Sequence, residues 1–141
     1  MYLLDTNVIS ELRKAGSGRA DSNVVTWAKA QSTTSLFISA MTILEIEMGI
    51  LQIARKDAKQ ADIYRTWLHS HVLTAFEDRI LPFDTSIALK CAKLHVPDPK
   101  SERDAMIAAT SIVHGLTLVT RNEKNFKHIS IELINPWLIN H

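Results

Sequence analysis

Three carboxylates in this sequence stand where an apolar segment or a loop gives way to a helical pattern. Asp5 directly follows the apolar residues 2–4, and Glu45 lies in the first turn of the helix predicted after the apolar segment 36–39. Asp104 lies in the first turn of the helix predicted after a proline-rich loop. If the apolar segments are parallel strands, their carboxyl ends face one ligand crevice, and we expect the acids to gather there.

Each of these acids also has a structural explanation. Asp5 can cap the helix that follows it, Thr42-x-x-Glu45 has the pattern of a capping box, and Ser101-x-x-Asp104 resembles one. Taken singly, such acids are more often structural than functional. Capping gives no reason for three acids to meet at one edge of a sheet, so their combined placement favours a functional site.

The residue types point to a hard metal ion. Gathered carboxylates repel one another and raise their own pKa values unless a cation neutralises them. A carboxylate cluster without His or Cys partners selects Mg²⁺ or Mn²⁺ rather than zinc. The six His residues form neither a His-x-x-x-His pair nor a recognisable triad, so zinc hydrolysis and acyl transfer lack support. The expected chemistry is the hydrolysis of a phosphate ester by metal-activated water.

Short apolar segments alternate with helical patterns along the whole chain. The predicted strands are residues 2–4, 36–39, 80–83, 116–120 and 131–134, and the predicted helices are residues 7–14, 23–30, 43–55, 57–76, 86–95 and 102–114. Strands joined by helical crossovers predict an α/β fold with a mainly parallel sheet covered on both faces. The loops at 15–21 and 96–101 are too short to be domain linkers, so we expect one domain over residues 1–141.

Composition excludes several classes of protein. Hydrophobic residues make up 46% of the chain and charged residues 22%, which argues against disorder. The net charge is +1, so any polyanion must be bound by a local arrangement of charges. Cys91 is the only cysteine and lies on an apolar helical face, where we expect a buried, unreactive thiol. No segment has the length of a membrane span or the pattern of a signal peptide, and we expect a cytoplasmic protein.

Four segments of the chain resemble, in order, the motifs of PIN-domain ribonucleases. They are residues 3–7 (LLDTN), 38–45 (ISAMTILE), 103–110 (RDAMIAAT) and 118–122 (LVTRN). The C-terminal residues 132–137 (ELINPW) further resemble the VapC toxins of bacterial toxin-antitoxin pairs. The resemblance implies a PIN-like three-layer α/β/α fold with a sheet of about five strands. It also implies that Asp5, Glu45 and Asp104 are the catalytic and metal-binding acids.

The fourth motif departs from the acidic form of the family. Many relatives place Asp where this chain has Asn122, or a carboxylate where it has Asn125, although Asn is also found in this region. We therefore count Asn122 among the predicted catalytic residues. A neutral amide adds no charge for a second metal ion, so we expect one well-held ion and a second that is weak or dependent on RNA.

Residues next to these motifs are candidates for substrate binding or for positioning water. They are Thr6, Asn7, Thr120, Arg121 and Asn125, although caps and structural hydroxyls explain these residue types equally well. A wider set of cations near the motifs could form a basic rim for RNA phosphates: Arg13, Lys14, Arg19, Lys100, Arg103, Arg121, Lys124 and Lys127. About half of such cations are ordinary solvated charges.

The resemblance implies a Mg²⁺-dependent endoribonuclease, with Mn²⁺ as a substitute, that leaves 5′-phosphate and 3′-hydroxyl ends. It also implies a homodimer that a small antitoxin neutralises in a hetero-oligomer, with the antitoxin's C-terminal segment in the acidic groove. An Arg of that segment would approach the carboxylates. The helices predicted at 43–55 and 57–76 are our candidates for dimer and antitoxin contacts, although core packing explains much of their apolar character.

Two other classes of function compete with this interpretation, and only the second of them remains open. Haloacid-dehalogenase phosphatases and receiver domains also present Asp after a first parallel strand. The phosphatases need a second Asp at the position of Asn7, and receivers need an acidic pair at the first strand; this chain has neither. A catalytically silent PIN-like module that binds RNA or a protein is the second alternative, and the neutral Asn122 favours it.

Overall fold

The computed structural model describes residues 1–140, and its centre is a five-stranded parallel sheet. The strands are β1 (Tyr2–Leu4), β2 (Leu36–Ser39), β3 (Ile80–Leu81), β4 (Thr117–Val119) and β5 (Leu133–Ile134), in the order β3-β2-β1-β4-β5. This confirms the predicted α/β fold with a parallel sheet. The chain winds outward from β1 to β3 and then crosses to β4 on the other side of β1, so the topological switch point lies at β1 and β4.

The first two strands along the chain were predicted best. The bounds of β1 and β2 match the prediction, whereas the other three strands are shorter than predicted. β3 stops at Leu81, and the next residue, Pro82, has no N–H for a ladder hydrogen bond. β5 loses residues 131 and 132 from the predicted strand, although the backbone N–H of Leu118 still donates to the carbonyl of Glu132.

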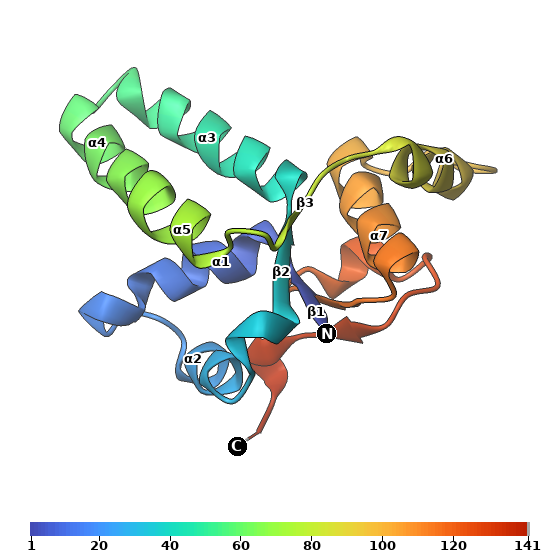
Figure 1. Ribbon diagram of the computed structural model, residues 1–141, viewed down its shortest axis with the longest axis horizontal. Coiled ribbons are helices and arrows are strands. Elements are labelled where there is room, and N and C mark those ends of the chain that lie inside the picture. The colour runs from blue at the N-terminus through green and yellow to red at the C-terminus, as the bar shows by residue number, and fades with distance from the viewer. Residues whose placement is uncertain (141) are drawn as a thin grey trace.

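Within residues 1–140, seven α-helices connect and cover the strands. They are α1 (Thr6–Arg13), α2 (Ser22–Lys29), α3 (Ala40–Ala54), α4 (Ala58–Trp67), α5 (Leu73–Ala75), α6 (Thr85–Leu94) and α7 (Glu102–His114). In Figure 1, α1 to α5 lie on one side of the sheet and α6 and α7 lie on the other, with α3 and α4 packed as a hairpin. The helical layers on both faces agree with the predicted architecture.

The prediction of one long helix at 57–76 is right in extent but not in regularity. Between α4 and α5, residues Leu68–Val72 form a π-helical segment with a wider turn. Leu68 and Val72 within it are both buried. Among residues 1–140, no helix has the length and hydropathy that crossing a membrane requires.

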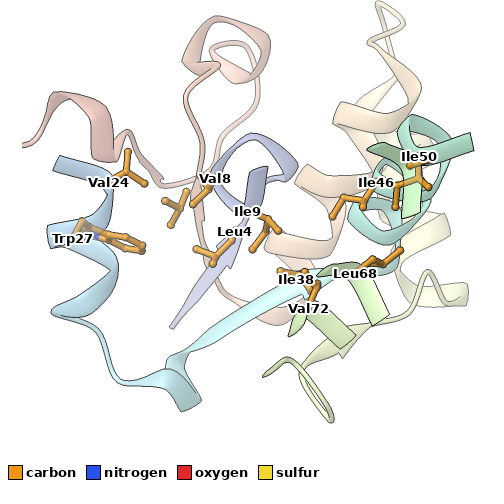
Figure 2. Close-up of a cluster of buried hydrophobic side chains, with 12 residues drawn as sticks. Leu4, Val8, Ile9, Val24, Trp27, Ile38, Ile46, Ile50, Leu68 and Val72 are labelled. Atoms are coloured by element: carbon orange, nitrogen blue, oxygen red, sulfur yellow. The ribbon is translucent and has the colours of Figure 1, made fainter. Parts of the chain in front are cut away.

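Alternation along β1 separates the two main cores. Leu4 packs with Val8, Ile9 and Ile38 in a cluster on the side of α1 to α4, which Figure 2 shows in close-up. The neighbouring Leu3 packs on the opposite side with residues of α7 and with Phe126. Successive side chains of a strand point to opposite faces, so burial of both leucines fixes the register of β1. Asp5 therefore directly follows a strand whose position is fixed by buried side chains on both faces of the sheet.

Candidate active site at the carboxyl edge of the sheet

Asp5 is a buried carboxylate held by the ends of two strands. Only 5% of the residue is exposed. Its Oδ1 accepts from the backbone N–H of Thr6 at 2.8 Å, as expected for the N-cap of α1. Its Oδ2 accepts from the Thr120 hydroxyl at 2.8 Å, at the end of β4. Asp5 is therefore a helix cap and a site candidate at once.

Asn7 and Thr120 complete this corner of the site. The Asn7 amide nitrogen lies 3.3 Å from both Asp5 Oδ2 and Thr120 Oγ1, and its carbonyl oxygen accepts from the backbone N–H of Arg121 at 3.1 Å. Thr120 Oγ1 also accepts from the backbone N–H of Asn122 at 3.1 Å. Asn7 and Thr120 thus tie the segment after β4 to the segment after β1. We call Asp5, Asn7 and Thr120 the strand-end corner.

Glu45 reaches the same edge from α3, but not from the predicted position. The helix begins at Ala40 because the Ser39 hydroxyl accepts from the backbone N–H of Met41 at 3.0 Å. The Thr42-x-x-Glu45 pattern is therefore not a capping box, and Glu45 lies in the second turn rather than the first. Ser39 at the end of the buried strand β2 sets this start. Glu45 Oε1 accepts from the Thr6 hydroxyl at 2.7 Å, which links α3 to the residue after Asp5.

Asp104 lies in the first turn of α7, as predicted, and is partly buried. Ser101 occupies the N-cap position, but its side chain accepts no capping hydrogen bond, so the second predicted capping box does not form. Within residues 1–140, the Asp104 carboxylate has no hydrogen-bond or ion-pair partner. Its neighbour Arg103 instead reaches across to α3, where Arg103 Nη1 lies 3.7 Å from Glu45 Oε2.

The Asp5 carboxyl is perturbed by its burial and by the charges of two other acids. Burial raises the pKa of the Asp5 carboxyl above its ordinary value. The hydrogen bonds from Thr120 and from the backbone of Thr6 act in the opposite direction, and the negative charges of Glu45 and Asp104 raise the pKa further. A buried carboxylate with two acids acting on it is an electrostatic setting that a cation would relieve.

The donor set fits a divalent metal ion, but the ligands are not preassembled. Within residues 1–140, no three His, Cys, Asp or Glu side chains lie close enough together to hold a metal ion. The hard oxygens of Asp5, Glu45 and Asp104 suit Mg²⁺ or Mn²⁺, and the unpartnered Asp104 carboxylate is free to become a ligand. Residues that would hold such an ion are therefore present, and side-chain rotation would have to bring them together.

The remaining candidates lie at the rim of the site. Asn122, Asn125 and Arg121 are exposed, and the described hydrogen bonds of the two asparagines involve their backbone atoms rather than their amides. The Arg121 guanidinium lies over the Trp137 ring at 5.2 Å from its centroid. A catalytic role for Asn122 and substrate roles for Arg121 and Asn125 remain predictions.

Two contributors were missed by the sequence analysis. Thr42 is fully buried, and its hydroxyl lies 3.1 Å from the Thr6 hydroxyl, so it supports the residue that holds Glu45. Asn135 donates from its side chain to the carbonyl of Arg121 at 3.3 Å and accepts from the backbone N–H of Trp137. The capping-box pattern concealed Thr42, and the resemblance of residues 132–137 to VapC toxins did not single out Asn135.

The sequence model of the PIN domain family matches residues 2–132 of this chain. The chain belongs to the PIN-domain family. The VapC ribonuclease Y4jK of Sinorhizobium fredii is 37% identical to this PIN domain over 142 residues, which cover 97% of the chain and 98% of the relative. The predicted family membership is thus confirmed, and the chain falls among the VapC-type toxins.

Solved structures agree with this assignment. The crystal structure of FitAcB from Neisseria gonorrhoeae matches with a TM-score of 0.88 and 30% identity, covering 99% of this chain and 100% of that one. A toxin-antitoxin complex from Klebsiella pneumoniae matches with a TM-score of 0.68 and 29% identity, again covering 99% and 100%. The fold of this PIN domain is therefore similar to these proteins over its whole described length.

Proposed function

We propose that this PIN domain is a metal-dependent endoribonuclease that acts as the toxin of a toxin-antitoxin pair. The observation that carries the proposal is the buried Asp5 at the end of β1, on which Glu45 and Asp104 both act. Membership of the VapC-type toxins, with a relative named as a ribonuclease, supplies the reaction class.

The residues of the site have three different proposed roles. Asp5, Glu45 and Asp104 hold Mg²⁺, with Mn²⁺ as a substitute. When bound, such an ion stabilises charge on the phosphate and promotes attack by water. Thr120 and Asn7 fix the orientation of Asp5 through the hydrogen bonds of the strand-end corner. Arg103 and Arg121 are exposed cations at the rim that would bind the phosphates of the RNA strand.

The proposed partners are a cognate antitoxin and a second copy of the chain. A similar solved structure is a toxin-antitoxin complex, which supports an antitoxin that covers the acidic edge. Leu44, Met48 and Leu51 on α3 are 42 to 54% exposed and recur at helical spacing, which supports contact of this helix with another chain. A cytoplasmic site of action agrees with a single buried, unpaired cysteine.

Cleavage of RNA by the purified protein tests the proposal. We expect cleavage of a structured RNA in Mg²⁺ and none in EDTA, with restoration by added Mg²⁺ or Mn²⁺. Labelling of product ends should reveal 5′-phosphates and 3′-hydroxyls. If the protein binds RNA equally well in Mg²⁺ and EDTA but cleaves in neither Mg²⁺ nor Mn²⁺, the chain is the catalytically silent binding module instead.

A further inference from the structure

Glu45 has two different partners, one on each carboxylate oxygen. Oε1 accepts the short hydrogen bond of 2.7 Å from the Thr6 hydroxyl. Oε2 faces the guanidinium of Arg103 across 3.7 Å, a distance typical of a loose ion pair. The same guanidinium nitrogen lies 3.8 Å from the sulfur of Met48, one turn further along α3. Arg103 thus crosses from α7 to α3 at the edge of the site.

The two partners of Glu45 differ in how easily they can leave. Thr6 is the residue after Asp5, is partly buried and belongs to the first turn of α1. The long side chain of Arg103 is 47% exposed. An exposed ion pair with a nitrogen–oxygen distance of 3.7 Å adds little stability. A divalent ion that binds Glu45 would compete with a positive guanidinium for the same carboxylate. Arg103 is therefore the partner that we expect to leave Glu45 when the ion binds.

The position of Arg103 in the chain decides where its guanidinium goes after it leaves Glu45. Arg103 directly precedes Asp104 in the first turn of α7, so the side chain stays tethered beside a second acid of the site. Guanidinium groups bind phosphate with paired hydrogen bonds, and a phosphate is what an RNA strand brings to this edge.

We propose that Arg103 is a positioning residue that pairs with Glu45 in the absence of a divalent ion and turns to an RNA phosphate when the ion is bound. The inference rests on the proposed nuclease function for its RNA step. It makes the binding of metal and of RNA cooperative, because the metal releases a cation that the RNA then uses. An ion pair that only joined α7 to α3 would not make RNA binding depend on the metal.

The first measurement is the affinity of the purified protein for Mn²⁺ by isothermal titration calorimetry. Arg103→Gln removes the competing charge, so we expect Mn²⁺ to bind about three- to fivefold more tightly than to the wild type. Arg103→Lys keeps the charge and should stay within about twofold of the wild type. A variant whose fold was merely damaged would lose metal affinity rather than gain it.

Arg121→Gln is the matched control for charge. It removes one guanidinium beside the same site, but Arg121 lies over Trp137 and has no carboxylate partner within residues 1–140. Any gain in Mn²⁺ affinity from the lower net charge alone should appear in both glutamine variants. The proposal is overturned if Arg103→Gln gains no more than Arg121→Gln.

The second measurement is the affinity for a short fluorescent single-stranded RNA by anisotropy, in EDTA and in Ca²⁺, with gels to verify that the RNA is intact. For the wild type we expect Ca²⁺ to tighten RNA binding several-fold. In Arg103→Gln this metal-dependent gain should fall to within about twofold, because the released guanidinium is missing. An undiminished gain in Arg103→Gln overturns the RNA step.

Failure of the proposed function would look different. A wild-type protein that neither binds Mn²⁺ nor cleaves RNA overturns both proposals together. The role of Arg103 alone is overturned if the wild-type protein binds Mn²⁺ and cleaves RNA, but Arg103→Gln gains no more Mn²⁺ affinity than Arg121→Gln and keeps the full Ca²⁺-dependent gain in RNA affinity.

Discussion

Asp5 and Glu45 meet at the same edge of the sheet, but the chain holds them in different ways. Asp5 is 5% exposed and accepts hydrogen bonds from the ends of both β1 and β4. The Glu45 side chain is 27% exposed and sits between one threonine hydroxyl and one loose ion pair. We call Glu45, Arg103 and Asp104 the helix-borne group, in contrast to the strand-end corner.

The difference shows how a site can be both defined and adjustable. The strand-end corner grows out of a strand buried on both faces, so its geometry is fixed before any ligand arrives. The helix-borne group depends on how α3 and α7 sit against the sheet and on long side chains that can rotate. Fixed ligands position the reaction, whereas movable ligands admit the ion and the substrate.

The largest expected effect comes from the fixed acid. Asp5→Asn should lower the rate of RNA cleavage in Mg²⁺ by about 100- to 1,000-fold, because a neutral amide replaces the most rigidly held metal ligand. The matched control is Asp84→Asn, since Asp84 is also a helix N-cap, of α6. It should change the rate by less than about twofold. Equal losses in the two variants would reduce Asp5 to a structural cap.

A smaller loss is expected from the movable acid. Asp104→Asn should slow cleavage by about 10- to 100-fold while leaving the free energy of unfolding unchanged, because its carboxylate has no partner within residues 1–140. Glu102→Gln is the control, being an exposed acid in the same turn of α7. Urea unfolding and single-turnover cleavage give both quantities. A large loss of stability in Asp104→Asn would contradict the contrast between the two parts of the site.

Removing support from the strand-end corner should affect stability and activity together. Thr120→Val deletes a fully buried hydroxyl that bonds Asp5 and accepts from the backbone of Asn122. We expect a loss of about 1 to 3 kcal/mol in the free energy of unfolding and an approximately tenfold slower cleavage. Thr117→Val, at the start of β4, removes only a partly exposed hydrogen bond to Glu132 and should cost less than about 0.5 kcal/mol. Similar losses in the free energy of unfolding for both variants would show that the hydrogen bonds of the strand-end corner add no particular stability.

The smallest expected effect is the pH dependence of stability. Burial raises the pKa of Asp5 in the folded chain above the ordinary value of 3.8, so the folded protein holds this proton more tightly than the unfolded chain. The corresponding stability is fully present below about pH 3.8 and is lost as the pH rises through the folded pKa. Urea titrations in EDTA should therefore show a shallower decline for Asp5→Asn than for the wild type. Parallel curves would mean that Asp5 is not desolvated.

Most of the fold followed from local patterns. The bounds of β1, β2 and α7 agree with the prediction because short apolar runs and the glycine that ends α7, Gly115, are features of a few adjacent residues. The short edge strands β3 and β5 were overextended, since a backbone at the edge of a sheet stops pairing where its neighbour stops. The wide turn at Leu68–Val72 inside the predicted long helix has no signal in the periodicity.

The candidate site also has features that follow from local sequence and features that do not. The sequence by itself determined which acids are candidates and the chemistry of their oxygens, because each stands at the end of an element whose pattern is local. Only the tertiary structure decided that Ser39 rather than Thr42 begins α3, that Thr120 bonds Asp5 and that Arg103 faces Glu45. The last two of these contacts join residues 115 and 58 positions apart, and their geometry is set by how the strands and helices pack together. Spacing along a chain carries no information about such distances, whereas close packing in the folded protein fixes them.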